Sequence, residues 1–419
     1  MSPDASLANG FRNLMHEKQQ IQLSVLTPVH IGTRGGKLTA LEFMVGDGRV
    51  HLIDENKLGN FLKDKNLIDY FVREVGKGPF RMERFLREKG RFQFPKDLSQ
   101  VSSLSVSGGN SEMQDFRPFT RDGMGQIYLP GSSVKGVFRT ALLYRILKQA
   151  KTVLDKVNEA IKRESQYLGK RKKFFSARFL QEDRLQKFEL PGGKYGPNED
   201  ILRCFSVRDS YPIGEVKTQV LCIRFLSRSS DGHQYWSQQK RGERKDLSVW
   251  VEALTAGTFA VELSWDQGLY TEFKKKNTPP VSNINDLLNA VTEMNQDLVQ
   301  SEIAHYTGRS AKIPPGMNYK EILQKMDMVR DDATMAADSV RKWYGQRPNS
   351  LFRIGFGTGM LSTTVGLCLP PELRQKIRDA CGSDPRPGDP APKSRRVWKK
   401  NETEYLPMGW LSVKPQEKK

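Results

Sequence analysis

The chain has 419 residues, of which 37% are hydrophobic and 9% aromatic, enough for a packed core, so wholesale disorder is excluded. Its 67 Lys and Arg residues exceed its 48 Asp and Glu residues, which gives a formal net charge of +19. This excess favours a polyanionic partner, nucleic acid first and an acidic membrane surface second, and carries no information about the fold.

Residues 1–20 are polar and lack the apolar segment of a secretory signal, so we expect a flexible N-terminal arm there. No stretch approaches the roughly 18 consecutive apolar residues of a membrane span. We therefore expect a soluble, cytoplasmic protein without a membrane partner. The four cysteines form no CxxC pair and the five histidines are dispersed, so the sequence predicts no metal site, and we expect no other cofactor.

Strand and helix signals alternate in the N-terminal part. Residues 21–32 are typical of a strand that runs into a glycine-containing loop. Residues 41–54 indicate a hairpin, because the Gly-Asp-Gly sequence at 46–48 tolerates the positive φ of a primed turn. Residues 55–92 have helical periodicity, and residues 102–111 form a Ser/Gly-rich link.

Residues 126–164 carry the strongest local signal, a short strand followed by a Pro-Gly turn and a long helix. Ser132 or Ser133 offers the N-cap of that helix. The next segment, residues 151–187, is strongly basic. Its 170–173 cluster is either a solvated loop or a nucleic-acid contact.

Strand signals return in the second half, where a helical region interrupts them. Strands and helices thus recur as β-α-ββ-α blocks. We expect strands at 202–210 and 216–228, a hairpin over 247–265, helices over 284–345, a proline-rich flexible loop over 382–396 and a closing strand at 405–413.

The start of the long helix is the first candidate binding site. Residues 130–139 (PGSSVKGVFR) combine a glycine turn, two hydroxyls and two basic residues at a helix N-terminus, where free N–H groups favour an anion. Lys135 and Arg139 lie on one helix face and can flank a phosphate. The alternative is an ordinary capped helix whose basic residues are solvated. A Walker A loop is excluded because its GxxxxGK[ST] pattern is absent.

A glycine-rich loop at residues 355–359 (GFGTG) is the second candidate, because glycine lets a backbone approach a ligand closely. It is not the GxGxxG dinucleotide fingerprint, and an ordinary glycine hairpin is an equal alternative. Residues 80–94 interleave Phe with Arg, a pattern that suits stacking on bases beside phosphate contacts. The alternative there is the buried stripe of a helix.

Catalytic motifs are scarce. The sequence contains neither GxSxG nor HExxH. His30 lies between a strand and a loop, where a lone histidine is more often a packing or backbone-bonding group than a general base. Glu42 and Asp54 are single carboxylates in ordinary surroundings.

Taken together, these motifs resemble the RAMP superfamily of CRISPR proteins. In their order they are most similar to the family of the fifth Csm subunit, the RAMP protein at one end of type III-A effector complexes. The segments that carry the resemblance are LTPVHIG (26–32), HLIDENKL (51–58), YLPGSSVKGVFRTALL (128–143), LRCFSVRDS (202–210), RIGFGTGMLSTTVG (353–366) and PMGW (407–410).

The resemblance implies an α+β fold with a ferredoxin-like, RRM-type RAMP core, in a single domain over residues 21–419. It also implies large helical insertions. These are expected at about 59–125, 150–200 and 270–350, where nothing matches the family, and a flexible stretch is expected at 382–400.

The function implied is non-catalytic: binding the 3′ part of crRNA, capping the filament of backbone subunits and assisting crRNA 3′-end maturation. Expected partners are crRNA, other type III effector subunits, above all the backbone RAMP subunit, and host nucleases that trim the RNA. The alternative is a metal-dependent RAMP ribonuclease that cleaves target or precursor RNA. The backbone subunit cuts with an aspartate that follows its own HIG-like motif. Here the corresponding residues 38–45 contain only Glu42 as an acid, so this alternative assigns catalysis to Glu42 or His30.

The resemblance also assigns RNA contacts residue by residue. Most should be made to phosphate and ribose, because guide sequences differ, so binding should tolerate sequence and weaken with salt. The residues are Ser132, Ser133, Lys135, Gly136, Arg139, Gly355, Gly357, Thr358 and Gly359, with His30 and Arg34 in addition.

Overall fold

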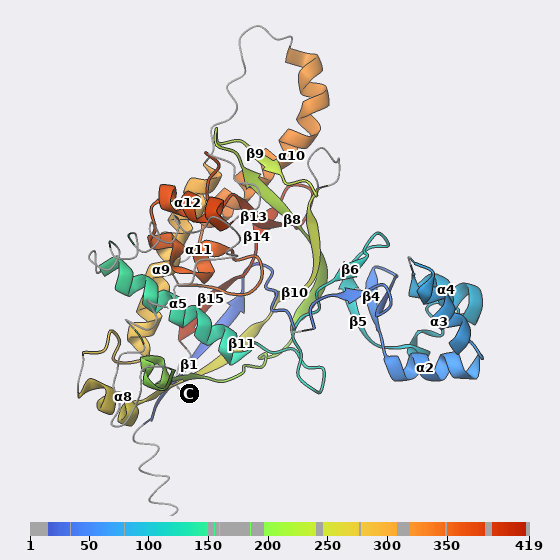
Figure 1. The fold of residues 1–419 in the computed structure, drawn as a ribbon, viewed down its shortest axis with the longest axis horizontal. Helices are drawn as coiled ribbons and strands as arrows, with labels where there is room; N and C mark the ends of the chain where they lie inside the picture. Colours follow the sequence, from blue (N-terminus) through green and yellow to red (C-terminus); the bar gives the residue numbers. More distant parts are fainter. Residues whose placement is uncertain are drawn as a thin grey trace, which may run out of the picture.

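The computed structural model describes residues 16–33, 35–78, 80–149, 155, 159, 185, 197–239, 246–275, 278–307, 319–347, 350–381 and 388–415 (Figure 1). For residues 319–331 and 380–381 only the backbone is described. The strands are β1 (His16–Val25), β2 (Leu38–Thr39), β3 (Phe43–Gly46), β4 (Arg49–Ile53), β5 (Ser102–Gly108), β6 (Asp115–Phe116), β7 (Phe205–Val207), β8 (Lys217–Arg228), β9 (Gln234–Trp236), β10 (Ser248–Ala256), β11 (Thr258–Asp266), β12 (Leu351–Arg353), β13 (Ser394–Lys399), β14 (Tyr405–Pro407) and β15 (Trp410–Pro415). The α-helices are α2 (Glu55–Asp64), α3 (Ile68–Gly76), α4 (Met82–Gly90), α5 (Gly131–Gln149), α8 (Gln267–Lys274), α9 (Ile284–Tyr306), α10 (Tyr319–Gly345), α11 (Met360–Thr363) and α12 (Pro371–Cys381).

The first sheet has five strands in the order β12-β15-β1-β11-β7, each antiparallel to its neighbours. Helices α5 and α9 pack together and against this sheet (Figure 1). Along the chain, β1-α5-β7-β11-α9-β15 is a βαββαβ unit whose strands lie in the spatial order β15-β1-β11-β7. This is the ferredoxin-like arrangement, so the expected α+β fold class is confirmed.

The main core forms between this sheet and its helices because the two sequence periods match. In β1, Ile21 and Leu23 are buried two residues apart, as required for one face of a strand. In α5, Val134 and Phe138 are buried four residues apart, as required for one face of a helix. Helix α9 belongs to the same core. It lies inside the segment 270–350 expected as an insertion, so that part of the expected insertion is core.

The second sheet runs in the order β14-β13-β8-β5-β4-β3, and β8 also pairs with β9 and β10. Helix α10 packs against β9 and β14. Strands β3, β4 and β5 carry a separate small lobe with helices α2, α3 and α4, which lies on the right in Figure 1. The lobe has its own apolar cluster, which includes Leu58, Phe61, Phe85 and Leu86.

Several local predictions are confirmed in this lobe. The hairpin β3–β4 turns at Asp47 and Gly48, whose φ values of 50° and 67° are those of a primed turn. The helical segment 55–92 forms α2, α3 and α4. Phe85 and Phe92 are buried in the lobe core, so for these two rings the alternative of a buried stripe is correct.

The Ser/Gly-rich segment 102–111 was expected as a link, and this is wrong because most of it is strand β5. Its serine side chains form hydrogen bonds to the neighbouring strands and do not interrupt the strand. The Ser102 hydroxyl donates to the Leu52 carbonyl at 2.6 Å, and the Ser107 hydroxyl donates to the Thr218 carbonyl at 3.0 Å. Small polar side chains therefore join β5 to β4 and to β8.

The hairpin expected over 247–265 is also wrong. Strands β10 and β11 are there, but β10 pairs with β8 and β11 with β1, in different sheets. The closing strand at 405–413 likewise divides between the sheets as β14 and β15. Both connections turn at a glycine of positive φ, 139° at Gly257 and 88° at Gly409.

Two segments expected to be flexible are partly strand. Residues 16–20 pair with β11, so the arm ends at residue 15 at the latest, and residues 394–399 form β13 between β8 and β14. Hydrogen bonds to neighbouring strands order both segments, and the hydropathy of a sequence does not reveal such pairing.

Residues 170–173 lie outside the described part of the chain. Within the described ranges, no helix has the length and apolar character needed to cross a bilayer.

Candidate nucleic-acid interface

Three segments far apart in the sequence meet beside the end of β1. They are the HIG loop (residues 26–32), the glycine-rich loop, which here includes Ile354 before its first glycine (354–359), and the PMGW segment (407–410). Backbone hydrogen bonds join all three. The Phe356 N–H donates to the His30 carbonyl at 2.7 Å, the Gly409 N–H to the Pro28 carbonyl at 2.8 Å and the Ile354 N–H to the Gly409 carbonyl at 2.9 Å.

Glycine is required where these segments touch. A Cβ on Gly355, whose φ is +90°, would lie 2.3 Å from the His30 carbonyl oxygen. A Cβ on Gly357 would lie 3.0 Å from Cβ of Met408. Gly359 also has a positive φ, but it faces open space. The structure therefore gives Gly355 and Gly357 a packing role, and Gly359 has room for a ligand to approach.

Thr358 shapes the loop from within. Its hydroxyl donates to the Gly355 carbonyl at 2.8 Å, and the residue is buried. The contacts of Gly355, Gly357, Thr358 and Gly359 with RNA stay predictions. Because the Thr358 side chain is turned inward, such contacts would fall mainly to backbone atoms of the loop.

His30 is a packing residue in this structure. It is 2% exposed, its Nδ1 lies 2.6 Å from the Glu252 carbonyl oxygen, and its ring makes edge contacts with Phe119 and Phe356. Burial lowers its pKa from 6.5 to about 4, with a smaller contribution from Arg117. The imidazole is therefore neutral at pH 7 and shielded from solvent, which leaves it poorly placed to contact RNA or to act as a base.

This burial predicts a pH dependence of stability. The pKa of His30 is lower folded than unfolded, so between pH 6.5 and 4 the unfolded chain binds the extra proton. We expect the free energy of unfolding to fall by up to about 3 kcal/mol as the pH drops through that window. His305, whose pKa burial lowers to about 2, acts in the same direction. Urea unfolding at a series of pH values measures this.

The matched variants for this measurement are His30→Asn and His16→Asn. His16 is exposed at the start of β1, so its ring stays in water in both states. His30→Asn should flatten the pH profile and His16→Asn should leave it unchanged. Equal profiles for the two variants would contradict the assignment to His30.

Helix α5 begins at Gly131, so the expected N-cap at Ser132 or Ser133 is wrong, and both serines lie in the first turn. The carboxylate of Asp209 accepts the Gly131 N–H at 2.7 Å. The first N–H group of the helix therefore already has a hydrogen-bond acceptor within the protein. Ser132 and Gly136 are exposed and Ser133 is half-buried, so this turn still presents polar atoms to solvent.

Lys135 and Arg139 do not project freely from the helix. The Lys135 ammonium donates to the Phe205 carbonyl at 2.6 Å, and Arg139 pairs with Asp200. Burial lowers the pKa of Lys135. Both side chains tie α5 to the chain around β7, and their contact with a phosphate stays a prediction that these bonds do not favour.

Glu42 lies in the turn before β3, not in a strand as expected. Its carboxylate accepts the N–H and the hydroxyl of Thr39 at 2.8 and 3.0 Å, so it closes that turn. Among the residues that the structure describes, no three His, Cys, Asp or Glu side chains gather as metal ligands would. Arg34 lies outside the described residues.

Two arginines at the junction were missed by sequence reasoning. The guanidinium of Arg117 lies 5.6 Å from the ring centre of Phe356, and Cβ of Arg396 would lie 3.2 Å from a Cβ on Gly357. The Nε of each is buried without a hydrogen-bond partner in the described part of the chain. Arg117 falls in a segment without family resemblance and Arg396 in the stretch expected to be flexible, so no local signal marked them.

A buried cluster of charged side chains lies next to the glycine-rich loop. Glu302 of α9 is 1% exposed and accepts two hydrogen bonds from Nε of Arg395, at 2.7 and 2.9 Å. Arg353, the last residue before the loop, lies 3.7 Å from the same carboxylate, and its guanidinium lies 4.9 Å from the ring centre of Trp410. One carboxylate thus faces two buried guanidinium groups, and the cluster links α9 to both sheets.

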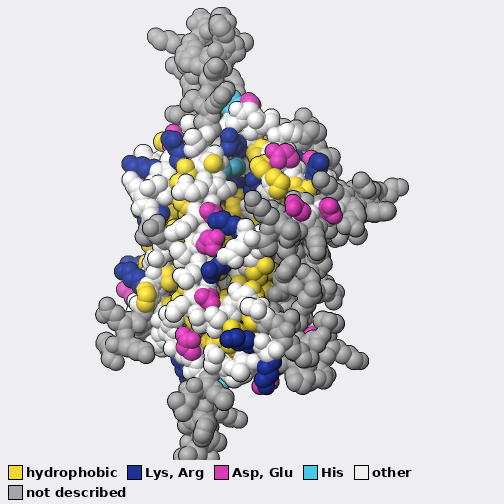
Figure 2. Space-filling model, turned by 90° about the vertical axis from the view of Figure 1, so that its left-hand side faces the viewer, with side chains coloured by type: hydrophobic (Ala, Val, Ile, Leu, Met, Phe, Trp, Pro, Cys, Tyr) yellow, Lys and Arg dark blue, Asp and Glu magenta, His cyan; other side chains and the backbone are white. Residues whose placement is uncertain are grey.

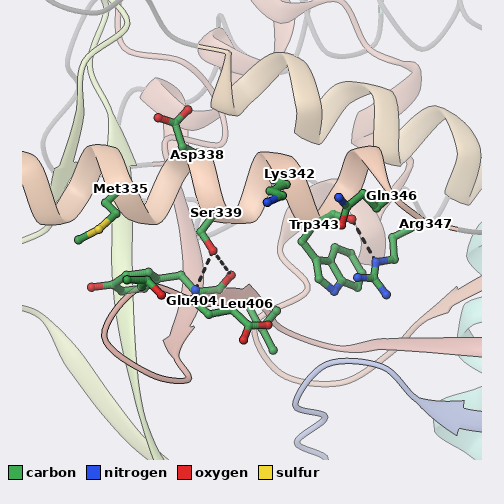
Figure 3. Close-up of a pocket in the computed structure, with 11 residues that line it drawn as sticks. Met335, Asp338, Ser339, Lys342, Trp343, Gln346, Arg347, Glu404 and Leu406 are labelled. Atoms are coloured by element: carbon green, nitrogen blue, oxygen red, sulfur yellow. Dashed lines mark hydrogen bonds between the residues drawn. The ribbon is translucent and has the colours of Figure 1, made fainter.

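Two further surfaces carry mixed charge. The side of the molecule that faces left in Figure 1 shows Lys and Arg interspersed with Asp and Glu (Figure 2). A pocket of about 530 Å³ between α10 and β14 has acidic and basic side chains in equal number (Figure 3). In it the Ser339 hydroxyl accepts the Tyr405 N–H at 2.8 Å and so closes the edge of β14. Because both signs of charge are present, neither surface favours the binding of an anion.

The ferredoxin-like core, with its glycine-rich loop seated on the HIG loop, defines the class of protein. The chain belongs to the RAMP superfamily, whose family model matches residues 22–359. It is similar to proteins named CRISPR system Cms protein Csm5. That of Methanocaldococcus jannaschii is 20% identical over 359 residues, which cover 83% of this chain and 72% of the relative. That of Enterococcus italicus is 28% identical over 155 residues, which cover 31% of this chain and 44% of the relative. That of Streptococcus thermophilus is 30% identical over 135 residues, which cover 30% of this chain and 37% of the relative.

Two solved structures share the fold. One is a chain in the cryo-EM structure of a Csm-crRNA-target RNA ternary complex of a type III-A CRISPR-Cas system, with a TM-score of 0.62 and 22% identity, covering 95% of this chain and 100% of that chain. The other is the crystal structure of T. onnurineus Csm5, with a TM-score of 0.58 and 21% identity, covering 93% and 99%. The expected resemblance to CRISPR RAMP proteins of the fifth Csm subunit is confirmed.

Proposed function

We propose that this protein is a non-catalytic RNA-binding subunit of a type III CRISPR ribonucleoprotein, which binds the 3′ part of crRNA, caps the backbone filament and assists crRNA 3′-end maturation. The observation that carries the proposal is the junction of the HIG loop, the glycine-rich loop and the PMGW segment in a RAMP fold. Its partners would be crRNA, the neighbouring effector subunits, above all the backbone RAMP subunit, and host nucleases that trim the RNA.

The chemistry of the junction, and separately that of the start of α5, suits contacts with an RNA backbone. Gly359 faces open space, and Ser132 and Gly136 are exposed on the first turns of α5. Backbone N–H groups and hydroxyls bind phosphate and ribose without distinguishing bases. The net charge of +19 adds attraction that acts equally on all sequences and weakens with salt.

The geometry supports a non-catalytic role over the ribonuclease alternative. His30, which that alternative uses as a base, is neutral and buried. Glu42 is occupied in closing a turn. Incubating the purified complex with target RNA and Mg²⁺ tests the choice, since cleavage that Glu42→Ala abolishes would establish the enzyme.

The first test is purification of the tagged protein from cells that express its whole locus, followed by sequencing of the bound RNA. Short RNAs that share a repeat-derived 5′ end are the expected result, together with the other effector subunits. A random mixture of cellular RNA, or no RNA, would contradict the proposal.

The start of α5 is tested at Gly136, where a Cβ meets no atom within 4 Å. Gly136→Asp adds a carboxylate to the exposed face of α5 and should weaken RNA binding about tenfold, because it repels phosphate. Gly136→Ala adds a methyl group without charge and should bind as the wild type does. Equal affinities of the two variants for crRNA would place the RNA elsewhere.

A further inference from the structure

A groove lined by more basic than acidic residues lies in the small lobe, which is on the right in Figure 1. It has a volume of about 240 Å³ and runs between α3 and α4. Four basic residues line it, Lys77, Arg81, Arg84 and Lys89. The segment 73–96 that builds it contains eight Lys and Arg residues against three Glu residues. Its charge is therefore more one-sided than that of the pocket beside α10.

The floor of the groove is aromatic. The rings of Phe80 and Phe85 are 5.6 Å apart, and Phe71 lies 5.5 and 5.4 Å from them. Phe85 is buried in the lobe core, whereas Phe80 keeps part of its surface in the groove. A partly exposed ring held by two others is a stacking surface that costs little to order.

Two of the four basic groups, Arg81 and Lys89, form no close ion pair with a described acid. The hydrogen bond from Lys77 lowers the pKa of the Glu74 carboxyl, and the nearby charge of Lys89 contributes to this shift. Lys77 pairs with Glu74 at 2.6 Å, and Arg84 pairs with Glu88 at 2.8 Å. Arg81 donates to the Ser111 carbonyl at 2.6 Å, which holds the guanidinium at the rim but leaves its charge uncompensated.

Lys89 lies 5.1 Å from the ring centre of Tyr70. Arg73 lies 5.2 Å from the same ring, so the exposed Tyr70 is flanked by two cations. Cations beside exposed aromatic rings suit a ligand that has both phosphate groups and flat bases.

We propose that the α3–α4 groove is a second RNA site, which holds a single-stranded segment with phosphates at Arg81 and Lys89 and a base against Phe80 or Tyr70. The inference rests on the proposed function in that RNA is the ligand, but it uses residues that the junction does not contain. Single-stranded RNA is favoured over duplex because a base must leave its stack to reach an aromatic floor.

The test uses the full-length protein and a fluorescent single-stranded oligouridine, titrated at several salt concentrations. The double variant Arg81→Ala/Lys89→Ala removes the two exposed cations assigned to phosphates without touching the aromatic floor. We expect affinity to fall about tenfold at low salt. The slope of log affinity against log salt should become shallower by about 1.4, at about 0.7 for each lost phosphate contact.

The matched control is Lys63→Ala/Lys65→Ala, which removes the same charge from the end of α2 in the same lobe but outside the groove. It should bind as the wild type does. An equal loss in both double variants would overturn the proposal in favour of diffuse attraction. Unchanged RNA affinity with loss of a co-purifying subunit would overturn it in favour of a protein-binding surface.

Gly136→Asp in the same assay separates this proposal from the proposed function. Weaker binding by Gly136→Asp, with unchanged binding by Arg81→Ala/Lys89→Ala, would contradict the groove proposal and leave the proposed function standing. A wild-type protein that does not bind the RNA would overturn both. Ultraviolet crosslinks from the oligouridine to residues 70–89 would support the groove directly.

Discussion

Gly355→Ala is expected to open the junction of the three segments, lowering the free energy of unfolding by about 3 kcal/mol and RNA affinity by about tenfold or more. An alanine at a φ of +90° is strained by about 1 kcal/mol. Its Cβ would also lie 2.3 Å from the His30 carbonyl oxygen, a backbone atom that can move only with the HIG loop. Such overpacking costs a further 1–3 kcal/mol or so.

The control for this variant is Gly359→Ala, in the same loop and at a similar φ of +77°, with no atom within 4 Å of the new Cβ. It should lose only the strain energy, about 1 kcal/mol, from its free energy of unfolding. Urea unfolding and titration with crRNA measure both variants. If the two lose equal stability, the close approach of Gly355 to His30 is not what holds the loop.

The elements that sequence predicted well are those whose signal is local. The primed turn at Asp47 and Gly48 needs only residues that tolerate positive φ. Helix α9 needs only an apolar stripe and a cap, which Asn283 supplies by accepting the Asp286 N–H at 2.9 Å. Such features depend on neighbours within four residues or so, and these are visible in the sequence.

The failures share one cause, which is that pairing between strands is not local. Nothing in residues 247–265 records that β10 joins β8 while β11 joins β1. The serines of β5 indicated a link because their partners, the carbonyls of Leu52 and Thr218, lie 50 and 111 residues away. The sequence shows each serine but not the distant chain segment that accepts its hydrogen bond.

In the candidate site, too, the local features could be predicted and the long-range contacts could not. Resemblance located the glycine-rich loop and the start of α5, but it did not show which side chains face solvent. Lys135 and Arg139 are tied to the chain around β7, and His30 is buried against Glu252, all contacts over more than 60 residues of sequence. Arg117 reaches the loop only through the tertiary fold.

The second large effect is expected at Glu302, because its carboxylate faces two guanidinium groups in the interior. Glu302→Gln keeps the shape of the side chain and removes its charge. Arg395 and Arg353, 6% and 3% exposed, would then be buried without a counter-ion. Breaking a buried ion pair from one side costs about 3–5 kcal/mol. Because Arg353 precedes the glycine-rich loop, RNA affinity should fall together with stability.

Glu293→Gln is the matched control, since it makes the same substitution on the same helix. Glu293 lies 3.2 Å from the Lys148 ammonium, and its side chain is 32% exposed, so its loss should cost about 1 kcal/mol or less. Urea unfolding compares the two. Equal, small losses would mean that water or a neighbouring carboxylate already compensates the buried arginines.

A double variant shows whether the cost comes from the uncompensated charge. Glu302→Gln/Arg395→Met removes the carboxylate and the guanidinium that it bonds most closely. If the stranded cation causes the loss, the double variant should be more stable than Glu302→Gln alone, because an apolar side chain of similar length replaces it. Strictly additive losses would instead mean that each side chain contributes only packing. Arg353 would still lack its carboxylate in the double variant, so recovery should be incomplete, and RNA affinity should recover less than stability.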